Sequence, residues 1–160
     1  MSRERQPVTA AVRALRAAGV RFTDHPYAYE EKGGTAVSAR ELGVDEHCVV
    51  KTLVMEDERK NPLIVLMHGD RNASTKELAR IIGVKSVASC SPDSAHRHTG
   101  YIVGGTSPFG TRKPLPVYLE ETVLALPKIY INGGKRGYLV GVDPRDVAAI
   151  LKPVLVRVAI

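Results

Sequence analysis

The apolar residues of this 160-residue chain are gathered in short runs that are rich in aliphatic and β-branched residues and bounded by polar or glycine-containing breaks. Runs of this length and composition are typical of β-strands. Two of them, Cys48–Met55 and Leu63–His68, are separated by a polar segment and are predicted to form a hairpin with an exposed loop. Further strands are predicted at Tyr101–Val103, Val117–Leu119, Ile129–Ile131, Tyr138–Val142 and Val154–Val158, and a short extended segment at Val20–Tyr29.

Helical periodicity and helix-terminal residues mark five other segments. The first begins near Pro7, carries apolar residues at helical spacing and ends at Gly19. Thr35 is the expected N-cap of the second helix, and Ser74 begins a capping box for the third. Because the strands outnumber the helices and do not alternate with them regularly, we expect an α+β fold around a mixed, curved sheet. The predicted helices are Pro7–Ala18, Thr35–Leu42, Ser74–Ile82, Ser91–Thr99 and Asp143–Leu151.

The bulk properties predict one globular domain spanning residues 1–160, because 44% hydrophobic and 25% charged residues are ordinary for a chain that builds its own core. A formal net charge of +6, spread over the chain, favours weak and salt-dependent attraction to a polyanion such as RNA. Cys48 and Cys90 belong to no C-x-x-C pair, which argues against a disulfide framework and fits a reducing cytoplasm. The polar segment Met1–Arg5 and the absence of an apolar run of roughly 18 residues predict a soluble protein without a membrane partner.

Several common chemistries are disfavoured by the sequence. The surroundings of Ser107 do not match the G-x-S-x-G pattern of a nucleophilic serine. His96 and His98 lack a third ligand at a recognisable spacing, so no metal site is expected. The chain also lacks the spacing of a phosphate-binding Walker loop. We therefore expect no metal and no cofactor.

Two glycine-rich segments and one lysine are the candidate functional features. The segments Gly100–Gly110 and Asn132–Gly137 each follow a predicted strand, and glycine allows main-chain N–H groups to approach a ligand closely. The two loops can therefore converge on one anionic, carbonyl-bearing ligand. Lys51 shares one face of its predicted strand with apolar residues, so its ammonium group either has a function or extends past them to solvent.

These features also carry a family resemblance. Three motifs resemble those of the YbaK/EbsC family, in the same order and at compatible spacing. They are Lys51-Thr52-Leu53, Thr99–Gly110 and Gly133–Gly137. Members of this family are free-standing relatives of the prolyl-tRNA synthetase editing domain. The resemblance extends from about Arg21 to Ile160. It implies a compact, barrel-like curved sheet flanked by helices.

The resemblance also implies roles for particular residues. Lys51, Gly104 and Gly105 are the expected catalytic residues, with the lysine stabilising charge on the aminoacyl ester or the terminal adenosine rather than attacking it. Phe22 or Tyr27 can stack on a base, although packing in the core is an equal alternative for either ring. The residues expected to bind substrate are Phe22, Tyr27, Thr106, Ser107, Pro108, Gly133, Gly134, Lys135 and Arg136.

The function implied by the resemblance is that of a trans-acting deacylase, which hydrolyses the ester of Cys-tRNA(Pro) with either the substrate thiol or water as the attacking group. A second hydrolytic site is useful because one pocket discriminates poorly between amino acids of similar size. The expected partners are the acceptor end of an aminoacyl-tRNA and, as a candidate, prolyl-tRNA synthetase, with no role for DNA. Two alternatives stay open: a deacylase for Ala-, Ser- or Thr-tRNA, and a non-catalytic module that binds tRNA or a synthetase.

Overall fold

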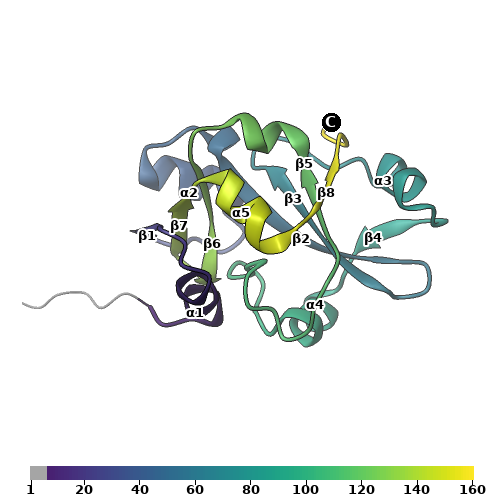
Figure 1. Cartoon of the computed structure of the whole chain (residues 1–160), viewed down its shortest axis with the longest axis horizontal. Helices are drawn as coiled ribbons and strands as arrows, with labels where there is room; N and C mark the ends of the chain where they lie inside the picture. The colour runs from purple at the N-terminus through teal and green to yellow at the C-terminus, as the bar shows by residue number, and fades with distance from the viewer. Residues whose placement is uncertain (1–6) are drawn as a thin grey trace, which may run out of the picture.

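The computed structural model describes residues 7–160, which form a mixed β-sheet flanked by helices (Figure 1). This arrangement confirms the expected α+β class, whereas the polar segment Met1–Arg5 lies outside the described residues. The strands are β1 (Thr23–Pro26), β2 (Val49–Asp57), β3 (Pro62–His68), β4 (Val87–Ser89), β5 (Val117–Glu120), β6 (Ile129–Lys135), β7 (Tyr138–Val142) and β8 (Val154–Val156). The helices are α1 (Ala10–Ala17), α2 (Gly34–Leu42), α3 (Thr75–Ile82), α4 (Pro92–Thr99) and α5 (Pro144–Leu151), with short 3-10 turns at Glu46–Cys48 and Glu121–Ala125.

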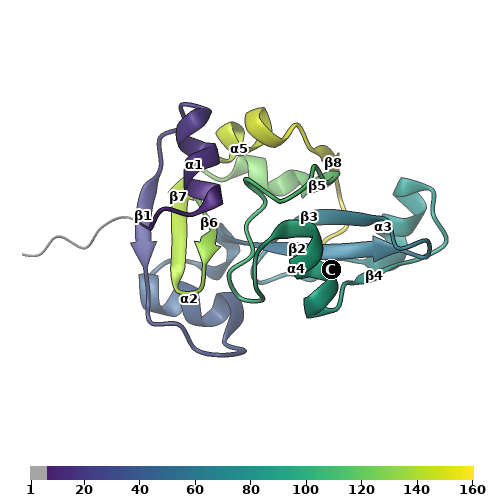
Figure 2. The same ribbon diagram turned by 90° about the horizontal axis from the view of Figure 1, so that it is seen from below.

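The strands form one sheet in the order β1-β7-β6-β2-β3-β5-β8, and β4 pairs with β2 outside this path. The β2–β3, β6–β7, β1–β7 and β2–β4 pairs are antiparallel, whereas β2–β6, β3–β5 and β5–β8 are parallel. The main hydrophobic core lies between the sheet and helices α1 and α5, and smaller cores lie beneath α3 and α2. Figure 2 shows α1 and α4 on the same side of the molecule, with the segment that follows α4 between them.

Most of the expected helix ends are present, but α1 begins at Ala10 with Thr9 as its N-cap, three residues after the predicted start at Pro7. Ser74, Ser91 and Asp143 each accept a hydrogen bond from a main-chain N–H of the following turn, as N-cap residues do. The N-cap predicted at Thr35 is wrong, because α2 begins one residue earlier and Gly33 is its N-cap. The Thr35 hydroxyl instead donates to a carboxylate oxygen of Glu46 at 2.8 Å. None of the helices within residues 7–160 is long and apolar enough to cross a membrane.

Two strand predictions need correction, and one strand was missed. The segment Tyr101–Val103 is not a strand, because it has no neighbouring strand to pair with and bends into a turn in which the Gly105 N–H donates to the Ile102 carbonyl at 2.9 Å. Strand β4 was not predicted, since three residues are too few to show an alternating pattern. Strand β8 ends two residues before the predicted end at Val158.

One edge of β2 is left open by the topology. Strand β6 pairs with β2 only at Val49 and Val50, and β4 pairs with it only from Met55 to Asp57. Among the described residues, no strand pairs with this edge between those two stretches. Main-chain groups beside Lys51 are exposed along this stretch, and the open edge of β2 forms one wall of the candidate site.

Candidate active site

A cavity of about 510 Å³ lies at the open edge of β2. Its other walls come from α2 and the segment before it, from α4, and from the two glycine-rich loops. Five of the predicted site residues line it: Tyr27, Lys51, Gly104, Thr106 and Arg136. Seven do not: Phe22, Gly105, Ser107, Pro108, Gly133, Gly134 and Lys135.

Lys51 is a half-buried cation in the wall of this cavity. It pairs with Met67 of β3, so its stem lies on an apolar face of the sheet. Burial lowers the pKa of Lys51, and the negative charges of Glu46 and Asp70 oppose this effect by raising it. The two carboxylates therefore favour a charged ammonium group at the cavity wall.

Thr52 supplies unpaired polar groups to the same wall. The main-chain groups of a strand point alternately to its two edges. On the open edge, the Val54 carbonyl accepts from the Cys90 N–H at 3.0 Å, so Thr52, two residues earlier, directs its own N–H and C=O to that edge. The Thr52 hydroxyl is also buried and has no hydrogen-bond partner among the described residues. Sequence reasoning missed Thr52, because its environment depends on which strands leave the edge open.

The two glycine-rich loops contact each other directly. The side-chain amide of Asn132 donates to the Gly104 carbonyl at 3.1 Å, and its oxygen accepts from the Gly134 N–H at 2.6 Å. The Arg136 guanidinium donates to the Val103 carbonyl at 2.8 Å. Asn132 had no predicted role, although its position before a glycine pair is a typical signal of a side chain that caps a turn.

Gly104 and Gly105 are required for different reasons. Gly104 has a φ of +85°, and a Cβ there would lie 2.5 Å from the Tyr29 hydroxyl. A Cβ on Gly105 would lie 2.8 Å from the main-chain nitrogen of Arg136. The Gly105 N–H already donates to a main-chain carbonyl, so it is not a free donor for a ligand. These glycines permit close contact between the loops, and only Gly104 lines the cavity.

Ser107, Pro108 and Phe109 are buried beneath the loop rather than exposed in the cavity. The Ser107 hydroxyl accepts from the Phe109 N–H at 3.2 Å, and the Phe109 ring belongs to the main core. The hydroxyl of Ser107 has no exposed surface, and no histidine is among the residues that line the cavity. The geometry thus offers no Ser-His pair at this site.

The other predicted residues that lie outside the cavity support its walls. A Cβ on Gly133 would clash with the Tyr138 ring, and one on Gly134 would lie 2.9 Å from the Tyr101 ring. Lys135 is exposed at the end of β6, where it pairs with Tyr138 of β7. Phe22 packs against the main core, which favours the packing alternative over base stacking for this ring.

Aromatic groups stand at the cavity wall formed by the segment before α2. Tyr27 and Tyr29 both line the cavity, and the Arg136 guanidinium carbon lies 5.3 Å from the centre of the Tyr29 ring. This separation is typical of a cation–π contact. The contact joins the segment before α2 to the β6–β7 turn, and it holds the planar, positively charged guanidinium group of Arg136 at the cavity wall.

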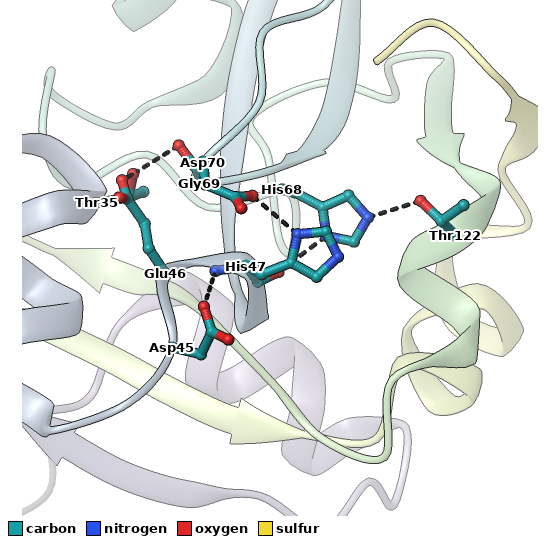
Figure 3. A network of polar contacts seen from close by, with 8 residues as sticks. All are labelled: Thr35, Asp45, Glu46, His47, His68, Gly69, Asp70 and Thr122. Atoms are coloured by element: carbon teal, nitrogen blue, oxygen red, sulfur yellow. Dashed lines mark hydrogen bonds and ion pairs between the residues drawn. The ribbon is translucent and has the colours of Figure 1, made fainter. Parts of the chain in front are cut away.

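A polar network connects the cavity wall to the interior of the sheet (Figure 3). Thr35 lines the cavity and donates to Glu46, while the His47 ring stacks on the His68 ring with their centres 3.7 Å apart. The Nδ1 of His68 lies 2.8 Å from the His47 carbonyl, which only accepts, so Nδ1 is the protonated nitrogen. Burial lowers the pKa of His68, so the ring is neutral at pH 7 and its Nε2 accepts a hydrogen bond from the Thr122 hydroxyl at 2.6 Å. This network holds the beginning of β2, and with it Lys51, in place.

No group of three or more His, Cys, Asp or Glu side chains that could hold a metal ion occurs within residues 7–160. His96 instead contacts the Tyr101 carbonyl at 3.2 Å through Nδ1. The thiol of Cys90 lies at the cavity wall, and burial raises its pKa, as does the charge of Glu56. A thiol in that environment stays protonated at neutral pH and is a weak nucleophile.

The sequence of this chain is similar to those of proteins that are named as an aminoacyl-tRNA deacylase or a tRNA ligase. The chain is 30% identical over 146 residues to the "Putative Cys-tRNA(Pro)/Cys-tRNA(Cys) deacylase EbsC" of Enterococcus faecalis, covering 91% of this chain and 89% of that protein. It is 36% identical over 106 residues to a proline–tRNA ligase of Thermodesulfovibrio yellowstonii, covering 64% of this chain but only 18% of the ligase.

Solved structures share the fold. The crystal structure of the hypothetical protein APE2540 superposes with a TM-score of 0.87 at 23% identity, covering 95% of this chain and all of that one. A "putative trans-editing enzyme for prolyl tRNA synthetase" superposes with a TM-score of 0.82 at 23% identity, covering 97% of this chain and 99% of that one. Residues 30–150, which include the open edge of β2 and both glycine-rich loops, match the aminoacyl-tRNA editing domain. The chain therefore belongs to the aminoacyl-tRNA editing domain family.

Proposed function

We propose that this protein is a trans-acting deacylase that hydrolyses the ester of Cys-tRNA(Pro). The observation that carries the proposal is the meeting of the Lys51 ammonium group and the unpaired main-chain groups of Thr52 in one cavity. A cavity of about 510 Å³ is within the usual range for small-molecule sites, and an aminoacyl-adenosine end is a ligand of suitable size. The similarity to EbsC supports cysteine as the amino acid.

In this mechanism the protein binds and polarises the ester, and the nucleophile comes from elsewhere. The N–H of Thr52 donates to the ester carbonyl or its developing oxyanion, and Lys51 stabilises the same negative charge without forming a covalent bond. The substrate thiol or a water molecule attacks the carbonyl carbon. The bond from that carbon to the ribose oxygen then breaks, and the ribose oxygen takes up the proton that the attacking thiol or water has lost, which restores the tRNA hydroxyl. Attack by water releases free cysteine, whereas attack by the thiol releases cysteine as a cyclic thioester that water then opens. Cysteine is suited to this site because its own thiol is an effective nucleophile.

A deacylation panel tests the function. Purified protein is incubated with Cys-, Ala-, Ser- and Pro-tRNA(Pro), with and without prolyl-tRNA synthetase, and the loss of the ester is followed over time. We expect selective hydrolysis of the cysteinyl ester. Selective hydrolysis of the alanyl or seryl ester would assign a different amino acid, and unchanged lifetimes for all four esters would make the protein non-catalytic. An S-alkylated cysteinyl ester separates the two nucleophiles, since it loses reactivity only if the thiol attacks.

Lys51→Ala tests the role of the cation. We expect kcat/KM for Cys-tRNA(Pro) to fall by about 10²-fold, the usual effect of removing one preorganised electrostatic contact. The control is Lys76→Ala, which removes an exposed lysine from α3 and is expected to leave the rate unchanged. Wild-type activity in a folded Lys51→Ala protein would exclude this residue from the mechanism.

A further inference from the structure

The positive charge of this protein is not spread evenly over the chain. Three segments, 7–23, 94–119 and 122–142, contain no aspartate or glutamate. They carry nine of the 23 lysines and arginines, which leaves 14 cationic residues against all 17 acidic residues in the remainder. The basic residues of the three segments are Arg13, Arg16, Arg21, Arg97, Arg112, Lys113, Lys128, Lys135 and Arg136.

The fold brings cations from all three segments together around the segment that follows α4. Burial raises the pKa of Tyr101 to about 12, and the positive charge of Arg13 on α1 opposes this effect by lowering it. The Arg112 side chain lies 3.7 Å from the position of a Cβ on Gly100. Burial lowers the pKa of His98, and the positive charges of Lys113 and Arg97 lower it further. Figure 2 shows α1, this segment and α4 side by side on the face turned to the viewer. We call the surface formed by Arg13, Arg97, Arg112, Lys113, Lys135 and Arg136 the basic face.

Within residues 7–160, the cations of this face form no ion pair with an acidic side chain. The ion pairs within the described residues involve five other lysines and arginines, and a histidine, but none of the six members of the basic face. A group of like charges without counter-charges repels itself, and a polyanion relieves that repulsion by replacing small counterions. The face also continues into the cavity, because Arg136 belongs to both and α4 contributes Ala95 to the cavity wall.

We propose that the basic face binds the phosphates of the tRNA acceptor end while the terminal aminoacyl-adenosine occupies the cavity. The identity of this ligand rests on the proposed function. Phosphate contacts position a nucleic acid without reading its sequence. The basic face therefore contributes affinity and orientation but does not select among tRNAs. Selection then depends on the amino acid that the tRNA carries or on a synthetase.

Two triple variants with equal changes of charge test this proposal. Arg97→Glu/Arg112→Glu/Lys113→Glu reverses three members of the face, none of which lines the cavity. The control, Arg59→Glu/Lys76→Glu/Lys85→Glu, reverses three exposed cations on the β2–β3 turn and around α3. Binding of an uncharged tRNA(Pro) transcript is measured between 50 and 200 mM salt, after circular dichroism and melting curves have shown that the variants are folded. If the first set does not fold, the corresponding glutamine substitutions replace it.

We expect the face variant to bind the transcript about tenfold or more weakly at 50 mM salt, and its slope of log affinity against log salt to be smaller by about 2 to 3. The control variant should retain the wild-type slope. On a cysteinyl-adenosine ester, which has no phosphates to contact, the face variant should react at the wild-type rate.

If both triple variants bind the transcript equally weakly, the proposed role of the basic face is overturned, because net charge alone would then explain the binding. A wild-type protein that does not bind the transcript at 50 mM salt would overturn it as well. If wild-type protein and variants bind as expected but no ester is hydrolysed, the basic face stands and the proposed deacylase function fails. The two proposals are therefore tested separately.

Discussion

The unpaired hydroxyl of Thr52 leads to a prediction whose sign is unusual for a change at an active site. A buried hydroxyl without a partner costs about 1 to 3 kcal/mol of stability, because it loses its hydrogen bonds to water and gains none in the protein. Thr52→Val removes this group and keeps nearly the same shape. We expect the free energy of unfolding to rise by about 1 to 2 kcal/mol, which for a protein of this size raises Tm by about 2 to 8 °C.

The effect of Thr52→Val on activity distinguishes a catalytic role of the Thr52 side chain from one of its main-chain N–H. The hydroxyl is buried, whereas the main-chain N–H that we propose to donate to the substrate is retained by valine. Deacylation of Cys-tRNA(Pro) should therefore change by less than about threefold, a small fraction of the loss expected when one oriented donor is removed.

Thr99→Val is the matched control for stability. The Thr99 hydroxyl is equally buried, but it donates to the Ala95 carbonyl at 2.8 Å and accepts from the Tyr101 N–H at 3.1 Å. Removing it should lower the free energy of unfolding by about 1 to 3 kcal/mol. Urea unfolding followed by circular dichroism measures both variants. If Thr52→Val destabilises the protein as Thr99→Val does, the Thr52 hydroxyl has a partner and the reasoning is refuted.

Two further predictions concern the loop contact and the buried histidine. Gly105→Val should lower Tm and abolish deacylation, because its Cβ would lie 2.8 Å from the Arg136 nitrogen and force apart the two loops that wall the cavity; a stable, fully active variant would show that this contact is dispensable. Burial lowers the pKa of His68 in the folded protein, so the unfolded chain binds the proton more readily. The stability contributed by neutral His68 should be complete above the unfolded pKa of about 6.5 and decline as the pH falls below it. Urea unfolding at several pH values tests this, and a decline that persists unchanged in His68→Gln would assign the effect to another group.

Features that depend only on residues close together in the chain were predictable from the sequence. The N-caps at Ser74, Ser91 and Asp143 were predictable because a short polar side chain bonds to the next helical turn, whatever surrounds it. The hairpin of β2 and β3 was predictable because two apolar runs joined by a short polar loop pair with each other. The ordered motifs also identified the family, since they require no knowledge of the contacts between them.

The construction of the candidate site depends on contacts between segments that are distant in the sequence. Val103 belongs to an apolar, β-branched run yet lies in no strand, because a strand also needs a neighbour that donates and accepts hydrogen bonds. Thr52 has main-chain groups facing the candidate site only because β6 and β4 both stop short of it on one edge of β2. Gly105, in the same way, contacts the opposite loop rather than the cavity. These outcomes depend on pairing between segments distant in the sequence, and local residue patterns do not encode which main-chain groups that pairing leaves unsatisfied.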